Sequence, residues 1–109
     1  MKKTIKFEIE LDDNYLPINI EMDTSDSSNK EDKIKALMLS AWSSNSNETL
    51  HLPLWTKDMP VTHMLIMYYQ TMLAMSNSLV KATGNDELAN SVKDYCEIFA
   101  QKAELKKLK

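Results

Sequence analysis

The sequence predicts an α+β protein: an antiparallel four-stranded sheet made of two hairpins, with a C-terminal antiparallel helical hairpin packed on one face. Apolar residues come at every second position in the first half of the chain, which is the period of a strand with one buried face. After Pro60 they come at helical spacing instead. The 109 residues suit a single domain, with the sheet in residues 4–59 and the helical hairpin in residues 60–109.

The first hairpin is predicted from a regular alternation in residues 4–11. Its apolar and charged members are Ile5, Phe7, Ile9 and Leu11 against Lys6, Glu8 and Glu10. Turn-forming residues follow, and the alternation resumes at Ile18, Ile20 and Met22. The next segment, residues 23–33, is acidic and polar without an apolar anchor, which predicts a mobile surface loop.

The second hairpin depends on an ambiguous segment, residues 34–42, whose apolar residues fit either a helix or a strand. We favour a strand, because residues 49–55 alternate Leu50, Leu52 and Leu54 and would pair back on it across a short polar connection. A possible capping box, Ser28 with Glu31, favours the helix alternative.

Two helices are predicted after Pro60. The first carries an apolar stripe from Val61 to Leu79 and ends at Gly84, a common helix stop. Asn85 can cap the second, whose stripe runs from Leu88 to Ala103. Asp58 is the predicted N-cap of the first helix, because its carboxylate could accept backbone N–H groups of the first turn.

Composition excludes several functions. Gly84 is the only glycine, so the sequence contains neither a P-loop motif nor a glycine-rich dinucleotide-binding motif. The net charge is −3 and every basic residue is a lysine, so we expect no nucleic-acid binding. No apolar run is long enough for a membrane span or a signal peptide, which predicts a soluble, cytoplasmic protein without direct membrane insertion.

Residues with catalytic or metal-binding chemistry form no convincing constellation. Methionine pairs near His63 are more typical of a core than of a copper site. The calcium-loop template that starts at Asp23 lacks its glycine and its final glutamate. Cys96 lies on an apolar stripe, where a small buried residue is expected. We therefore expect no catalytic residue, no metal and no cofactor, and interpret the chain as a non-enzyme.

One apolar surface exceeds what a two-layer core requires. Both alternating sets of residues 34–42 are apolar, so one of them must lie on the far face of the sheet. Trp55 is out of phase with the three leucines before it and would join that face. We predict an interface there for a protein partner or a second copy, formed by Leu37, Leu39, Ala41 and Trp55.

Four segments carry a resemblance to a known family: FEIELDDNYLPINIEMD, KALMLSAW, LHLPLWTKDMPV and DYCEIFAQK. Together they resemble the gliding motility protein GldC family, over nearly the whole chain. The most specific of them is LWTKDMPV, residues 54–61. Pro53 and His63 depart from the more polar or acidic residues expected at their positions.

The resemblance implies an accessory protein of bacterial gliding, without established enzymatic activity and linked to membrane-anchored gliding proteins. It names neither the direct partner nor the oligomeric state, and does not separate a structural role from one in assembly. Four strands and two helices are also similar to the SecB export chaperone, and this fold-level analogy provides the alternative of a chaperone or peptide-binding protein.

Overall fold

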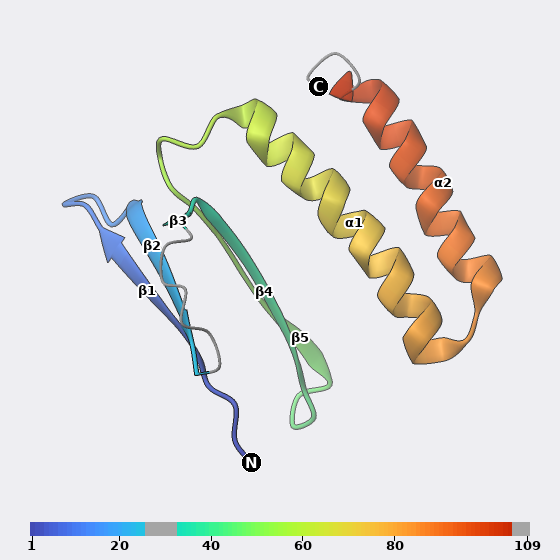
Figure 1. Ribbon diagram of the computed structural model, residues 1–109, viewed down its shortest axis with the longest axis horizontal. Coiled ribbons are helices and arrows are strands. Elements are labelled where there is room, and N and C mark those ends of the chain that lie inside the picture. Colours follow the sequence, from blue (N-terminus) through green and yellow to red (C-terminus); the bar gives the residue numbers. More distant parts are fainter. Residues whose placement is uncertain (26–32, 106–109) are drawn as a thin grey trace. The chain divides into compact units, whose positions relative to one another are not determined.

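The computed structural model describes residues 1–25 and 33–105, which form five strands and two helices (Figure 1). The chain divides into two compact units, Met1–Met59 with the strands and Pro60–Lys109 with the helices. The α+β class is confirmed, and the change from sheet to helix falls where the sequence predicts it. That the helices cover one face of the sheet in a single domain stays a prediction.

The strands form two antiparallel sheets. The elements of the first sheet are β1 (Ile5–Leu11), β2 (Pro17–Thr24) and β3 (Lys33–Ile34), and those of the second are β4 (Ala36–Ser43) and β5 (Glu48–Trp55). Both predicted hairpins, β1–β2 and β4–β5, are confirmed. The single four-stranded sheet is wrong, because the chain bends at Lys35: Ile34 pairs with Ile20 of β2, whereas Ala36 pairs with Trp55 of β5.

The ambiguous segment is β-structure. Residues 36–43 pair along their whole length with β5, so the strand prediction is confirmed and the helix alternative is wrong. The hairpin closes through Asn47, which adopts a positive φ of 55° and donates its N–H to the carbonyl oxygen of Ser43 at 2.9 Å. Asparagine tolerates this left-handed conformation better than most residues, which suits it to the end of a turn.

Both ends of the segment predicted as a mobile loop, residues 23–33, belong to strands. Asp23 and Thr24 belong to β2 and Lys33 to β3, because both ends continue the ladder of the first sheet. Residues 26–32 lie outside the described residues, and with them the possible capping box at Ser28 and Glu31 and most of the calcium-loop template.

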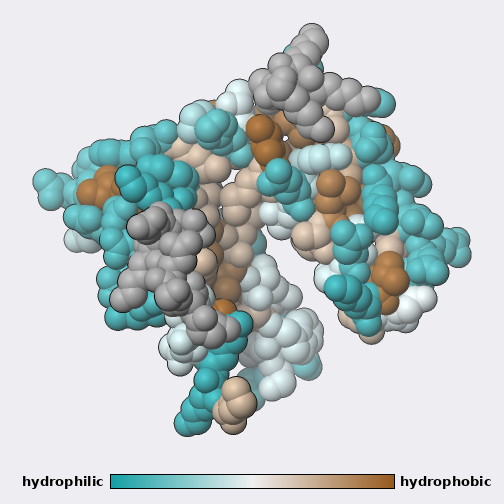
Figure 2. All heavy atoms as spheres, in the orientation of Figure 1, coloured by the Kyte–Doolittle hydropathy of each residue, from teal (hydrophilic) through white to brown (hydrophobic). Residues whose placement is uncertain are grey.

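The first hairpin has one apolar and one charged face. Ile20 is buried, with 1% of its surface exposed, opposite the half-buried Ile9. The other face is rich in charged side chains, and Lys6 Nζ lies 2.9 Å from Glu8 Oε1 within β1. In Figure 2 this part of the molecule is predominantly teal. The alternation therefore separates the two environments as the sequence predicts.

Backbone hydrogen bonds join the two sheets immediately after β5. Thr56 donates its N–H to the carbonyl oxygen of Lys35 at 2.8 Å, and Lys57 donates its N–H to that of Pro17 at 3.1 Å. Lys35 stands where β3 passes into β4, and Pro17 begins β2. We refer to residues 56–58 as the junction, because this short segment bonds both to the start of β2 and to the residue that precedes β4.

Two ion pairs reinforce the junction. Lys57 Nζ lies 2.8 Å from Asp12 Oδ2, and Lys35 Nζ lies 2.9 Å from Asp58 Oδ2. The two charged residues of the LWTKDMPV segment, Lys57 and Asp58, thus form ion pairs within the strand unit. Because both pairs reach solvent, each contributes little alone, and their effect is to fix the geometry that the backbone bonds define.

Asp58 is not the cap of the first helix. The N-cap position is Pro60, and no side chain caps it. The Asp58 carboxylate instead binds Lys35, which satisfies its charge within the strand unit. The Thr56 hydroxyl and the Lys35 ammonium group lower the pKa of Asp58. The buried Thr56 oxygen has no partner in full hydrogen-bond geometry among the described residues, so the ion pair is the better-defined contact.

The helices α1 (Val61–Thr83) and α2 (Asp86–Lys102) run antiparallel (Figure 1). Gly84 ends α1 with φ 69° and donates its N–H to the carbonyl oxygen of Val80 at 2.7 Å. The side chain of Asn85 then accepts the N–H of Leu88 at 2.9 Å. The predicted stop and cap are both confirmed, since each depends only on residues within one turn.

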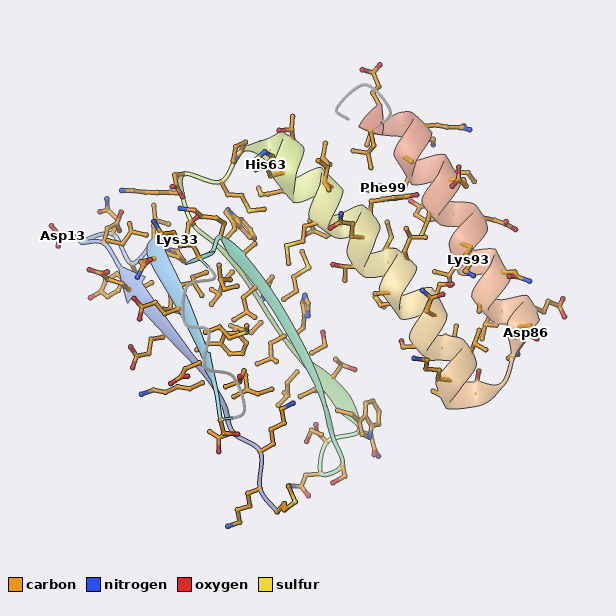
Figure 3. The ribbon with its side chains drawn as sticks, in the orientation of Figure 1. Asp13, Lys33, His63, Asp86, Lys93 and Phe99 are labelled. Carbon is orange, nitrogen blue, oxygen red and sulfur yellow. The ribbon has the colours of Figure 1, made fainter. Side chains whose placement is uncertain are left out.

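Small residues line the contact between the helices. Ala89, Cys96 and Ala100 of α2 are buried, as is Ser76 of α1, whose hydroxyl donates to the carbonyl oxygen of Ala89 at 3.1 Å. Figure 3 shows Phe99 pointing from α2 toward α1. Short side chains allow the helix backbones to approach closely, so Cys96 serves here as the small buried residue that the sequence predicts.

Asp12 should contribute to the fall of the free energy of unfolding at low pH. The Lys57 ammonium group and the N–H groups of Leu16 and Asn14 lower its pKa from 3.8 to about 2. The unfolded chain therefore takes up this proton at a higher pH, and the stabilisation is complete above about pH 4 and lost toward pH 2. We predict that Asp12→Asn flattens this fall in the free energy of unfolding, measured by denaturant titration at stepped pH. The neighbouring Asp13→Asn should keep the wild-type slope; parallel profiles for all three proteins would contradict the assignment.

The cap at Asn85 should stabilise α2 measurably. Asn85→Ala removes the acceptor for the Leu88 N–H and should lower the free energy of unfolding by about 1 kcal/mol. Asn90→Ala is the matched control, because Asn90 is exposed inside the same helix and should be nearly neutral. Thermal unfolding followed by circular dichroism measures both; equal effects at the two positions would argue against capping.

Candidate interaction surface on the second hairpin

The register of β4 and β5 sorts their side chains onto two faces, because directly opposed residues of an antiparallel pair share a face. Leu37 lies opposite Leu54, and Leu39 opposite Leu52. We call this side the leucine face; its residues are Leu37, Leu39, Ala41, Leu50, Leu52 and Leu54. The other side is the tryptophan face; its residues are Ala36, Met38, Ser40, Trp42, Thr49, His51, Pro53 and Trp55.

The predicted interface is divided by this register. Leu37, Leu39 and Ala41 lie on the leucine face, whereas Trp55 lies opposite Ala36 on the tryptophan face. Their grouping into one surface is therefore wrong. The alternation of β5 shows that Trp55 is out of phase with its leucines, but only the pairing with β4 decides which set of β4 joins it.

Apolar side chains are exposed on both faces. On the leucine face Leu50 is 62% exposed, and Leu39 and Leu52 are exposed to a lesser degree. On the tryptophan face the exposed fractions are 66% for Trp42 and 47% for Trp55. In Figure 2 tan and brown spheres cover the upper part of the β4–β5 hairpin and its lower end is nearly white, in contrast to the teal of the first hairpin. The second hairpin is thus the apolar part of the strand unit.

An open hollow of about 370 Å³ lies beside Trp55. Its lining residues are Leu16, Pro17, Pro53, Leu54, Trp55 and Lys57. They come from both sheets of the strand unit, so the hollow exists only because the junction holds the end of β5 against the start of β2. Apolar side chains dominate its wall. Lys57 provides a charged group whose ammonium is paired with Asp12.

Sequence reasoning identified Trp55 but missed its neighbours. Two of these neighbours follow the first predicted strand: Pro17, whose residue type indicates only a turn, and Leu16, an exposed leucine in an otherwise polar turn. Pro53 was noted as a departure from the family pattern. It lacks an N–H, which is tolerated in an edge strand such as either strand of a two-stranded sheet, and it places a flat ring beside Trp55. An exposed leucine beside proline was the available signal.

The histidines and the cysteine considered for catalysis or metal binding lie at separate places in the two units. His51 Nδ1 lies 2.7 Å from the hydroxyl oxygen of Ser40 across the hairpin, and Cys96 is buried in the helical unit. His63 lies in the first turn of α1 (Figure 3). Within residues 1–25 and 33–105, no three His, Cys, Asp or Glu side chains are grouped as metal ligands. Neither described helix is long and apolar enough to cross a membrane.

Fold and surface together define a class: a small α+β protein with exposed apolar and aromatic side chains on a β-hairpin. Residues 17–105 match the family model described as gliding motility-associated protein GldC-like, and the chain belongs to this family. The match begins at β2, so β1 lies outside it. No curated protein and no solved structure gives a significant match to the chain.

Proposed function

We propose that this protein is a non-enzymatic, cytoplasmic accessory protein of the bacterial gliding machinery, which binds a membrane-anchored gliding protein. Membership of the GldC-like family supports the association with gliding. The observation that supports binding is the position of Trp55, a half-exposed indole at the wall of an apolar hollow. Trp55, Leu16 and Pro53 form the proposed binding surface.

Tryptophan beside a hollow is a typical anchor of a protein interface. Its large ring buries much apolar area, while the indole N–H can still bond to the partner. A stable contact buries about 800 Å² on each partner, more than this hollow supplies, so surrounding polar residues must form the rim. Lys57 lines the hollow and stays exposed while it is paired with Asp12, so it is one candidate for this rim.

The leucine face is a separate candidate surface. It carries three exposed leucines but no residue that lines the hollow apart from Leu54. Leu37, Leu39 and Ala41, proposed from the sequence as partner contacts, remain a proposal for this face alone. The two faces must be tested by separate variants, since a double variant would change opposite sides of one hairpin.

Affinity purification from the native gliding cell tests the proposal. We expect the wild-type protein to retain one membrane-anchored partner in a fixed ratio, and Trp55→Ala to reduce its recovery at least about tenfold, as loss of a central anchor does. Tyr15→Ala is the matched control, because Tyr15 is an exposed aromatic residue of the same unit outside the hollow. It should leave recovery unchanged.

Three outcomes would contradict this assignment. If the Trp55→Ala variant still retains the partner but the Leu39→Asp variant does not, the interface is on the leucine face. Recovery of many unrelated unfolded chains, with suppression of their aggregation, supports the chaperone or peptide-binding alternative. Unchanged partner recovery in both folded variants removes the hairpin from the interface altogether. Circular dichroism of each variant establishes that the fold is intact.

A further inference from the structure

β1 offers an unpaired backbone edge. In the first sheet the order is β1-β2-β3, and no other described strand pairs with the outer side of β1. Ser25 donates its N–H to the carbonyl oxygen of Thr4 at 3.0 Å, which marks Thr4 as a residue whose backbone faces β2. By alternation the N–H and C=O groups of Ile5, Phe7 and Ile9 point away from β2.

Neither a proline nor a bulge blocks pairing along most of this edge. Residues 5–10 contain no proline, and the ladder irregularity of β1 comes only between Glu10 and Leu11. In the second sheet, where both strands are edge strands, β5 differs from β1 because it carries Pro53 in its interior. Natural proteins block exposed edges with proline, bulges or charged side chains, lysine especially. The charges of β1 have both signs, Lys6 next to Glu8 and Glu10, so they oppose chance pairing but favour a strand with the complementary order of charges.

We propose that two copies of this protein associate through antiparallel pairing of their β1 strands. In the proposed register Phe7 lies opposite Phe7 of the second copy, and Ile5 opposite Ile9 of the second copy. The outward backbone groups of each strand then meet one another. Lys6 faces Glu8 of the second copy twice in the dimer, in the close, non-hydrogen-bonded positions where side chains interact most strongly.

Charge selects this register among those that backbone geometry allows. A shift of two residues in one direction places Glu8 opposite Glu8 of the second copy. A shift in the other direction places Lys6 opposite Lys6. Both juxtapose like charges at the symmetry axis, which is unfavourable. Within each chain Glu8 already pairs with Lys6 at 2.9 Å. The proposed register adds the Lys6 of the second copy beside Glu8, which in its own chain also lies opposite the carboxylate of Glu21.

The positions of the apolar side chains on β1 are compatible with the same register. Ile5, Phe7 and Ile9 share one face of β1, and Ile5 is 54% exposed. Pairing would continue this apolar row into the second copy and set two phenylalanine rings side by side. A strand pair of this length falls short of the roughly 800 Å² per partner of a standard interface. Association should therefore be reversible and dependent on concentration.

Charge reversal tests the pairing in the full chain. Sedimentation velocity over a range of protein concentrations should show a monomer–dimer equilibrium. Glu8→Lys should weaken the dimer about tenfold or more by placing lysines opposite each other, and adding Lys6→Glu should restore it. Glu8→Lys should leave the fold intact, because the Lys6–Glu8 pair that it removes is exposed and contributes little, and because position 8 lies opposite Glu21. Glu10→Lys is the control, because Glu10 would face the uncharged Thr4 of the second copy.

Cross-linking tests the register independently. In a Cys96→Ser background, a mixture of Lys6→Cys and Glu8→Cys chains should form disulfides between positions 6 and 8 under mild oxidation, because non-hydrogen-bonded pairs bring Cα atoms to about 4.5 Å. A mixture of Lys6→Cys and Glu10→Cys should cross-link far more slowly. A monomer at every concentration, no rescue by the double reversal, or preferred cross-linking of positions 6 and 10 would each overturn the proposal.

Discussion

The strand unit depends on the junction, three consecutive residues that serve two sheets at once. Thr56 and Lys57 give their backbone N–H groups to Lys35 and Pro17, and two ion pairs add side-chain contacts around them. Because the chain bends at Lys35, the two hairpins do not share a ladder. The junction therefore supplies the bonds that hold the end of β5 beside the start of β2, and with them the hollow beside Trp55.

A two-stranded hairpin cannot bury both of its faces by itself. In β4 and β5 both faces are nevertheless apolar, with Trp42 and Trp55 on one and the leucines on the other. Exposed apolar area of this kind is typical of a surface that another chain or another part of the same chain covers. The first hairpin has the opposite composition, with charged residues on one face. Its candidate for association is therefore the unpaired backbone edge of β1.

Much of the fold could be predicted because its signals are local. The strand alternation of residues 4–11, the stop at Gly84 and the cap at Asn85 each depend on neighbours within a few residues, and the structure has all three. The candidate site was less accessible to prediction. Trp55 was recognised, but Leu16 and Pro17 reach it only through hydrogen bonds made some forty residues along the chain.

By itself the sequence determined the type and order of the elements, because strand and helix periods and capping chemistry are written in consecutive residues. It also carried the family motif. Only the tertiary structure decided that the sheet divides at Lys35, that Leu39 and Trp55 face opposite ways, and that Asp58 binds Lys35 rather than capping α1. Each of these features depends on a residue that is distant in the sequence. The segment that pairs with a strand sets its register, and the position of Lys35 decides the ion pair of Asp58.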